Sequence, residues 1–198
     1  MYKLRVATTV VVLFSLTAVL SCDLLLAPKQ GRWNPNDPNA DLETVSQTLY
    51  PAEDGYLGST LPWNDFSVEI NAKNDEYCLL KFDISTLPDM ITTAQLQLYC
   101  TVSPGDSNVS AHEILQSWDP ATINWVTVSS SEFFDPNPIT TTYVDAPSLT
   151  YSWTLDDAVY DLGYGILLMG DDLDEVRFAS SEATTNPPVL TIEGYNKK

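Results

Sequence analysis

Basic side chains are scarce in this sequence. Its 198 residues include nine lysines and arginines against 27 aspartates and glutamates, which gives a formal net charge of −18 at pH 7. A field of that sign repels nucleic-acid phosphates and anionic polysaccharides. Nucleic acid is therefore excluded as a partner, and the high charge favours a protein that remains a monomer.

Histidine and recognisable catalytic motifs are also scarce. The single histidine, His112, lies in a stretch of mixed polarity with no motif around it, so a structural role is favoured over a catalytic one. No Gly-x-Ser-x-Gly motif, phosphate-binding loop or zinc-ligand spacing occurs. Carboxylate pairs suited to glycoside hydrolysis are too numerous to single one out. We expect a protein that is not an enzyme, with a glycan-acting enzyme as one alternative.

The longest apolar stretch lies at the N-terminus. Lys3 and Arg5 precede a largely apolar run, residues 6–20, which ends just before Cys22. A basic start and an apolar core of this length predict an export signal, residues 1–21. Its last residues resemble a bacterial lipobox, in which Cys22 becomes the lipidated first residue. We expect an exported protein held on a bacterial membrane by its lipid alone, facing the periplasm or the cell exterior; plain secretion and an uncleaved anchor are the alternatives.

Residues 22–45 carry three prolines among Asn, Asp and Gly and show little periodicity. This composition predicts a flexible tether, and a solvated linker is favoured over a calcium loop there. The remainder, residues 46–195 with a short tail at 196–198, is long enough for one well-filled core. Loss of the signal would leave seven basic residues against 27 acidic ones, a formal net charge of −20.

Apolar and polar side chains alternate through residues 77–100. Cys78, Leu80 and Phe82 share one face of the first half, and Leu96 and Leu98 share one face of the second. A period of two predicts half-buried strands. Further strands are expected at 43–49, 63–70, 108–115, 164–169, 176–179 and 188–195, turns at 50–58 and 104–106, and one short helix at 154–163. Long helical stretches are missing beyond the N-terminus, so we expect an all-β fold, a jelly-roll-like β-sandwich with one short helix.

The three cysteines divide into one near the export signal and two in the alternating segment. If the two strands of residues 77–100 pair antiparallel about Asp89, Cys78 and Cys100 lie opposite each other. A disulfide there would stabilise the fold by roughly 3 kcal/mol. We expect this disulfide, and the alternative is that both cysteines remain small buried thiols.

Four segments in a specific order resemble the DNRLRE-type domain of secreted bacterial proteins. They are residues 79–88 (LLKFDISTLP), residues 91–99 with their Ala-x-Leu-x-Leu-Tyr core, Trp118 with Thr122 and Trp125, and residues 163–168 followed by 178–182 and 188–190. The resemblance implies a β-sandwich similar to a carbohydrate-binding module. Members of that family are associated with acidic polysaccharides such as alginate, which basic residues bind. Because this chain has few basic residues, we expect a neutral glycan instead.

Exposed aromatic rings would carry such binding. Trp63, Tyr143 and Tyr151 are the candidates, because they lie in loop-like stretches outside the segments that carry the resemblance. In the alternative, a structural or adhesive surface domain, these rings would simply pack. Trp118 and Trp125 are expected to pack rather than to form a glycan platform, because a buried indole needs only one polar partner.

Calcium is the one cofactor that the sequence suggests. Asp171, Asp172, Asp174 and Glu175 place four carboxylates within five positions. Like charges at this spacing repel, and a hard cation with oxygen ligands would relieve them. Water and salt would relieve the repulsion more cheaply, so a solvated acidic turn is favoured and a calcium site is the alternative.

Overall fold

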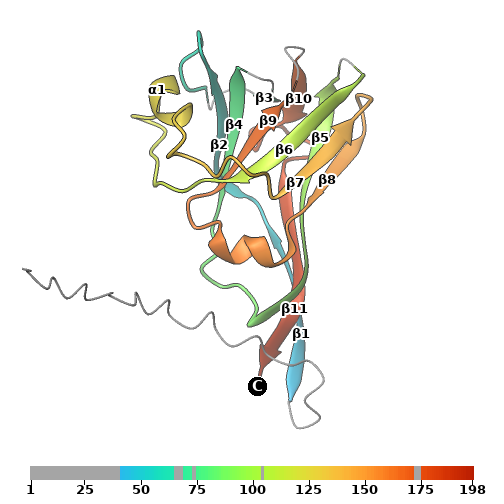
Figure 1. Cartoon of the computed structure of the whole chain (residues 1–198). Helices are drawn as coiled ribbons and strands as arrows, with labels where there is room; N and C mark the ends of the chain where they lie inside the picture. The colour runs from blue at the N-terminus through green and yellow to red at the C-terminus, as the bar shows by residue number, and fades with distance from the viewer. Residues whose placement is uncertain (1–40, 65–68, 73–74, 104, 172–174) are drawn as a thin grey trace, which may run out of the picture. The chain divides into compact units, whose positions relative to one another are not determined.

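Two antiparallel sheets make up the part of the chain that this computed structural model describes, which is residues 41–64, 69–72, 75–103, 105–171 and 175–198. The six-stranded sheet has the order β1 (Leu42–Leu49), β11 (Val189–Lys197), β5 (Met90–Val102), β10 (Val176–Ala179) and β3 (Glu69–Ala72), with β8 (Thr150–Thr154) also paired to β5. The five-stranded sheet has the order β2 (Pro51–Gly58), β4 (Glu76–Phe82), β9 (Ile166–Gly170), β6 (Ser107–Glu113) and β7 (Thr140–Val144). The predicted all-β sandwich is confirmed (Figure 1).

The main core lies between the two sheets. Cys78, Leu80 and Phe82 of β4 and Leu96 and Leu98 of β5 all belong to it and are at most 5% exposed. The predicted inward faces of both strands are therefore confirmed. Alternation gives this result reliably, because successive side chains of a strand point to opposite faces.

The predicted pairing of these two strands with each other is wrong. β4 pairs with β2 and β9, whereas β5 pairs with β8, β10 and β11, so the intervening residues cross from one sheet to the other. Cys78 lies opposite Leu168 and Cys100 lies opposite Phe178. Both cysteines are buried free thiols, and the predicted disulfide is not formed. Alternation indicates which face of a strand is buried but not which strand is its neighbour.

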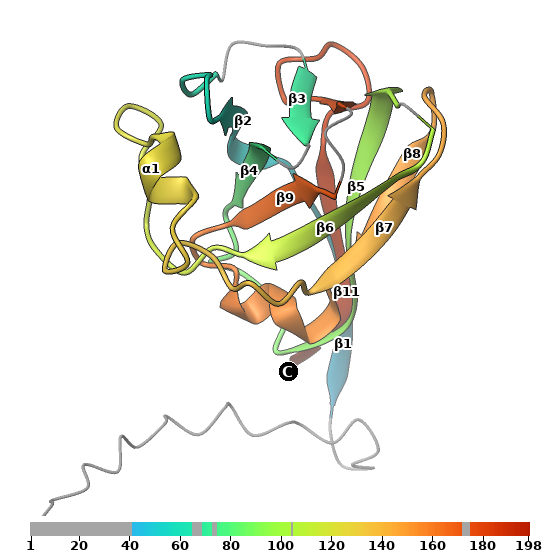
Figure 2. The same ribbon diagram turned by 45° about the horizontal axis from the view of Figure 1, so that its top comes forward.

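A second apolar cluster covers part of the outer face of the five-stranded sheet. Its buried members are Leu57, Tyr77, Leu79, Ile114, Trp118, Val128, Phe133 and Leu167. Alternation with Cys78 and Leu80 predicts that Leu79 points to the outer face of β4, yet Leu79 is fully buried because residues 114–134 fold over it. We call this segment the aromatic cover. Figures 1 and 2 show its short helix α1 (Trp125–Val128) near β2 and β4 and away from β7.

The aromatic cover is held by its tryptophans. Trp118 is 8% exposed, and its Nε1 donates to the Tyr164 carbonyl at 2.7 Å, so the predicted packing of this indole is confirmed. Trp125 packs against Tyr77 with ring centroids 4.8 Å apart. Asn124 caps α1, because its side chain accepts from the Thr127 amide. The helix has only four residues, too few to show a helical periodicity in the sequence.

Three expected elements differ in detail. The helix predicted at 154–163 is a shorter 3₁₀ helix, η1 (Asp156–Asp161), because Thr154 is the last residue of β8. The expected turn at 50–58 is strand β2, because pairing with the buried β4 overrides its turn-like composition. Of the expected strand at 63–70, only the end lies in β3, and residues 65–68 lie outside the described residues.

Within the described ranges, no helix has the length and apolar character needed to cross a membrane.

Candidate functional site

The first of the three candidate aromatic residues belongs to the packed part of the molecule. Trp63 is half-buried, and its ring contacts that of Trp118 with centroids 5.3 Å apart. Gly55 of β2 lies against the same ring, because a Cβ atom there would come within 2.7 Å of Trp63. Trp63 therefore helps to hold the aromatic cover on the sheet and does not form an open platform.

The other two candidates lie on strands of different sheets that approach each other, Tyr143 at the β7 edge of the five-stranded sheet and Tyr151 in β8 of the six-stranded sheet. Tyr143 is in β7, and 51% of its surface is exposed. Tyr151 is in β8 and is half-buried, and its hydroxyl donates to Asp145 Oδ1 at 2.7 Å. The charge of Asp145 also acts on Tyr143. Asp145 therefore interacts with both tyrosines, but Tyr151 packs against the main core, and Tyr143 is the one with the more exposed ring.

Strand pairing places a row of polar side chains beside Tyr143. Asn108 of β6 is its direct cross-strand partner. On the other side of β6, Asp171 follows the end of β9, and it accepts from the Asn108 backbone amide at 2.9 Å and from Asn108 Nδ2 at 2.7 Å. All three side chains are exposed. The row crosses three strands, or roughly 10 Å at the usual strand spacing.

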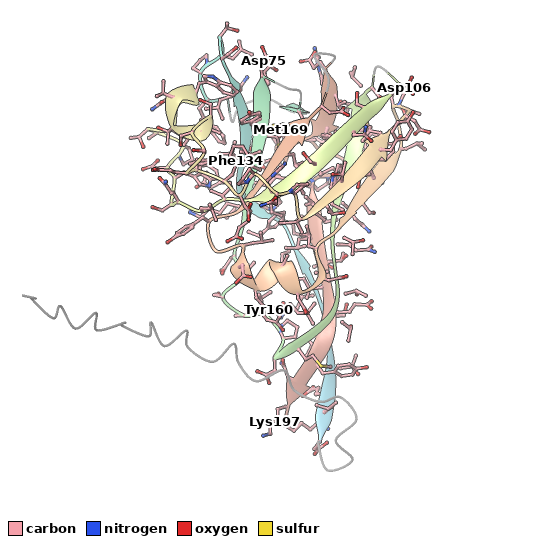
Figure 3. All side chains as sticks on the ribbon, viewed as in Figure 1. Asp75, Asp106, Phe134, Tyr160, Met169 and Lys197 are labelled. Atoms are coloured by element: carbon pink, nitrogen blue, oxygen red, sulfur yellow. The ribbon has the colours of Figure 1, made fainter. Side chains whose placement is uncertain are left out.

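A second row runs parallel to the first. Thr141 pairs with Ser110, and Ser110 pairs with Met169, so these three side chains lie on the same outer face. Thr141 is exposed, and the other two are half-buried. The aromatic cover begins beyond this row. In Figure 3, Asp106 marks one end of the open surface and Phe134 marks the cover, with Met169 between them.

We call this open surface the Tyr143 patch. It consists of Asp106, Asn108, Ser110, Thr141, Tyr143, Asp145, Met169 and Asp171. One exposed aromatic ring, one thioether and several hydrogen-bonding groups lie here on neighbouring strands. Such a surface can stack on the flat face of a ligand and bind its hydroxyl groups.

The charges of the patch act on Tyr143. Its hydroxyl donates to the carboxylate of Asp106. That hydrogen bond raises the pKa of Tyr143 above its ordinary value, and partial desolvation and the charges of Asp106 and Asp145 raise it further. Tyr143 therefore remains a neutral hydrogen-bond donor over the physiological pH range.

His112 lies beside the patch, at the next outward position of β6 after Ser110. The residue is only 2% exposed, and its Nδ1 lies 2.8 Å from the Asp135 carbonyl oxygen. A carbonyl only accepts, so Nδ1 donates to it, and Nε2 lies 2.8 Å from Ser110 Oγ, which also lies 3.1 Å from the Met169 carbonyl oxygen. The ring also contacts Phe134 at a centroid distance of 5.3 Å. His112 thus links the patch to the aromatic cover.

The proposed calcium ligands are only partly described. Asp171 accepts two hydrogen bonds from Asn108, and Glu175 pairs with Arg177 at 2.7 Å. Asp172 and Asp174 lie outside the described residues. Among the described residues no group of three or more His, Cys, Asp or Glu side chains is arranged to hold a metal ion. Calcium binding by the full set of four carboxylates stays a prediction.

Sequence reasoning missed most of the polar members of the patch. Asn108 and Ser110 alternate with the buried Val109 and Ala111, so their outward direction could be inferred. Their neighbours could not be, because residues near 108, 141 and 169 come together only through the order of β7, β6 and β9.

A comparison with curated proteins finds no match to the chain. A comparison with protein families matches residues 46–194 to carbohydrate-binding module family 96. The match spans most of the chain and includes every strand that contributes to the Tyr143 patch. The chain belongs to carbohydrate-binding module family 96.

Proposed function

We propose that this protein is a non-catalytic glycan-binding module, that the Tyr143 patch is its binding surface, and that its ligand is a glycan without acidic groups. The observation that carries this proposal is the exposed Tyr143 ring. It lies among hydrogen-bonding side chains on a part of the sheet that the aromatic cover leaves open. Family membership supplies the ligand class, and the patch supplies a surface of suitable chemistry.

The positions of the basic residues support a ligand without acidic groups. Within the described ranges, none of them belongs to the patch. Lys81 lies over the Trp118 ring of the aromatic cover, 5.9 Å from its centroid, and Arg177 pairs with Glu175. The charged side chains of the patch are all carboxylates, so an acidic sugar would meet charge of its own sign there.

The N-terminal segment extends the proposal to location. We propose that the chain is exported and lipidated at Cys22, so that a flexible tether holds the module on a bacterial membrane. Palmitate labelling should mark the wild-type protein and not a Cys22→Ala variant. An unlabelled wild-type protein in the secreted fraction would exclude the lipid anchor and leave the module's ligand unaffected.

Binding is tested with polysaccharides without acidic groups, both neutral and amine-bearing, in affinity electrophoresis, after a glycan array has identified a retained glycan. Tyr143→Ala should weaken binding roughly tenfold, because the variant loses the ring that stacks on the sugar. Tyr164→Ala is the matched control, since Tyr164 is 45% exposed and lies outside the patch. Single-site affinity is expected in the micromolar range or weaker, so polymeric ligands give the clearest signal.

Two results would favour the alternatives. If no glycan is retained, or if both tyrosine variants bind as the wild type does, the domain is structural or adhesive, or it binds elsewhere. Release of reducing sugar from a retained glycan would identify a glycan-acting enzyme and exclude the non-catalytic assignment.

A further inference from the structure

We infer that the glycan bound by the Tyr143 patch carries protonated amino groups, as in a polymer of glucosamine whose amines are not acetylated. This inference rests on the proposed function, since it concerns the ligand of the same surface. It goes further by naming the chemical group that distinguishes the preferred sugar from other glycans without acidic groups.

The first argument is the position of the carboxylates around the exposed ring. Asp106 accepts the hydroxyl proton of Tyr143 in a hydrogen bond, and Asp145 acts on the same tyrosine through its charge. Asp171 follows β9, two strands away from Tyr143, and accepts hydrogen bonds from the side chain and backbone of Asn108 in the strand between them. A sugar stacked on Tyr143 would therefore have carboxylates on more than one side.

The second argument is that two of these carboxylates keep an acceptor available. Asp106 uses Oδ1 for Tyr143, and Asp145 uses Oδ1 for Tyr151. Within the described part of the chain, neither Oδ2 has a hydrogen-bond donor and neither residue has a cationic partner. An ammonium group has three donors and no acceptor, so it matches these oxygens in both charge and hydrogen bonding.

The third argument concerns Tyr143 itself. The face of a tyrosine ring attracts a cation placed over it, and the attraction adds to that of nearby carboxylates. A carboxylate cluster alone would be an ordinary acidic surface of an acidic protein. The combination of an exposed ring, open carboxylate oxygens and membership of a carbohydrate-binding family indicates a sugar that carries its own positive charge.

The test compares two short oligosaccharides that differ at the amine. The full chain is titrated by calorimetry with a glucosamine tetramer and with an N-acetylglucosamine tetramer at 150 mM salt. Short ligands avoid the multivalent attraction between a long polycation and an acidic protein. Wild-type protein should bind the glucosamine tetramer roughly tenfold more tightly than the N-acetylglucosamine tetramer, because two exposed ion pairs each contribute a modest free energy.

Charge variants assign this preference to the patch. The double variant Asp106→Asn/Asp145→Asn keeps an acceptor oxygen at each site and removes two charges, and it should bring the affinity ratio close to one. The control Glu43→Gln/Glu132→Gln removes two exposed charges elsewhere, from β1 and from the aromatic cover, and should keep the wild-type ratio. Thermal melting confirms that both variants fold.

Each outcome decides between the two proposals. Loss of the preference in the patch variant alone supports the inference. Equal binding of both tetramers, abolished by Tyr143→Ala, would overturn the inference and leave the proposed function standing. An equal fall in the ratio in both double variants would assign the preference to overall charge and overturn the inference. Failure of every oligosaccharide and polysaccharide to bind would remove both.

Discussion

Asp54 is an informative site for testing the structure, because it is a buried carboxylate whose two hydrogen bonds both come from Ser181. It lies in β2 and is 3% exposed. One of its oxygens accepts from the Ser181 amide at 2.9 Å, and the other accepts from the Ser181 hydroxyl. These contacts join β2 to the loop before β11, which is 127 residues away in the chain.

Replacing Asp54 with alanine and with asparagine should give different results. Alanine removes both acceptors and leaves the Ser181 amide without a partner, which costs about 2–3 kcal/mol in the free energy of unfolding. Asparagine keeps one acceptor for the amide, and its Nδ2 can donate to the serine hydroxyl. It also removes a charge from a buried site, so the change at pH 7 should stay within about 1 kcal/mol.

The same residue predicts a pH dependence. Burial raises the pKa of Asp54 above 3.8, and the charges of Glu182 and Glu53 raise it further, while the hydrogen bonds from Ser181 act in the opposite direction. A carboxyl with a raised folded-state pKa holds its proton more tightly in the folded state than in the unfolded state. Its favourable contribution is therefore complete below the unfolded pKa and is lost as the pH rises through the folded pKa.

The assay is urea unfolding followed by tryptophan fluorescence between pH 3 and pH 8. The free energy of unfolding of the wild type minus that of Asp54→Asn should be constant at the lowest pH. This difference should fall as the pH rises above 3.8. If Asp54→Asn is as destabilised as Asp54→Ala at pH 7, or if the difference rises with pH, the account of Asp54 as a buried and costly charge is refuted.

Two further predictions concern the cores. Trp118→Phe keeps an aromatic ring but removes the donor to the Tyr164 carbonyl, so urea unfolding should show a loss of about 1–3 kcal/mol; an unchanged midpoint would contradict the role of this hydrogen bond. In a Cys22→Ala protein, Cys78 and Cys100 should react with a thiol reagent at pH 8 only after unfolding, because burial raises the pKa of Cys100 to about 11 and that of Cys78 well above its ordinary value. Fewer than two reactive thiols in the unfolded protein, or a mobility shift on reduction, would show that the disulfide forms.

Alternation in the sequence was a reliable guide to the inner core. Leu80 and Leu96 could be assigned to buried faces because each lies in a segment with a strict period of two. The same pattern misassigned Leu79, since the outer face of β4 is buried by a segment that begins more than 30 residues later. Alternation with a period of two identifies the more apolar face of a strand. It contains no information on whether another segment packs on the opposite face.

The sequence by itself determined the all-β class and the inward faces of β4 and β5, because both depend on local pattern. Composition alone determined the excess of acidic residues, which disfavours anionic partners. Only the tertiary structure decided that Trp63 is packed while Tyr143 is open, that Cys78 and Cys100 lie in different sheets, and which side chains surround Tyr143. The physical reason is strand order: hydrogen bonding between distant segments chooses each strand's neighbours, and a binding surface built across several strands exists only after that choice.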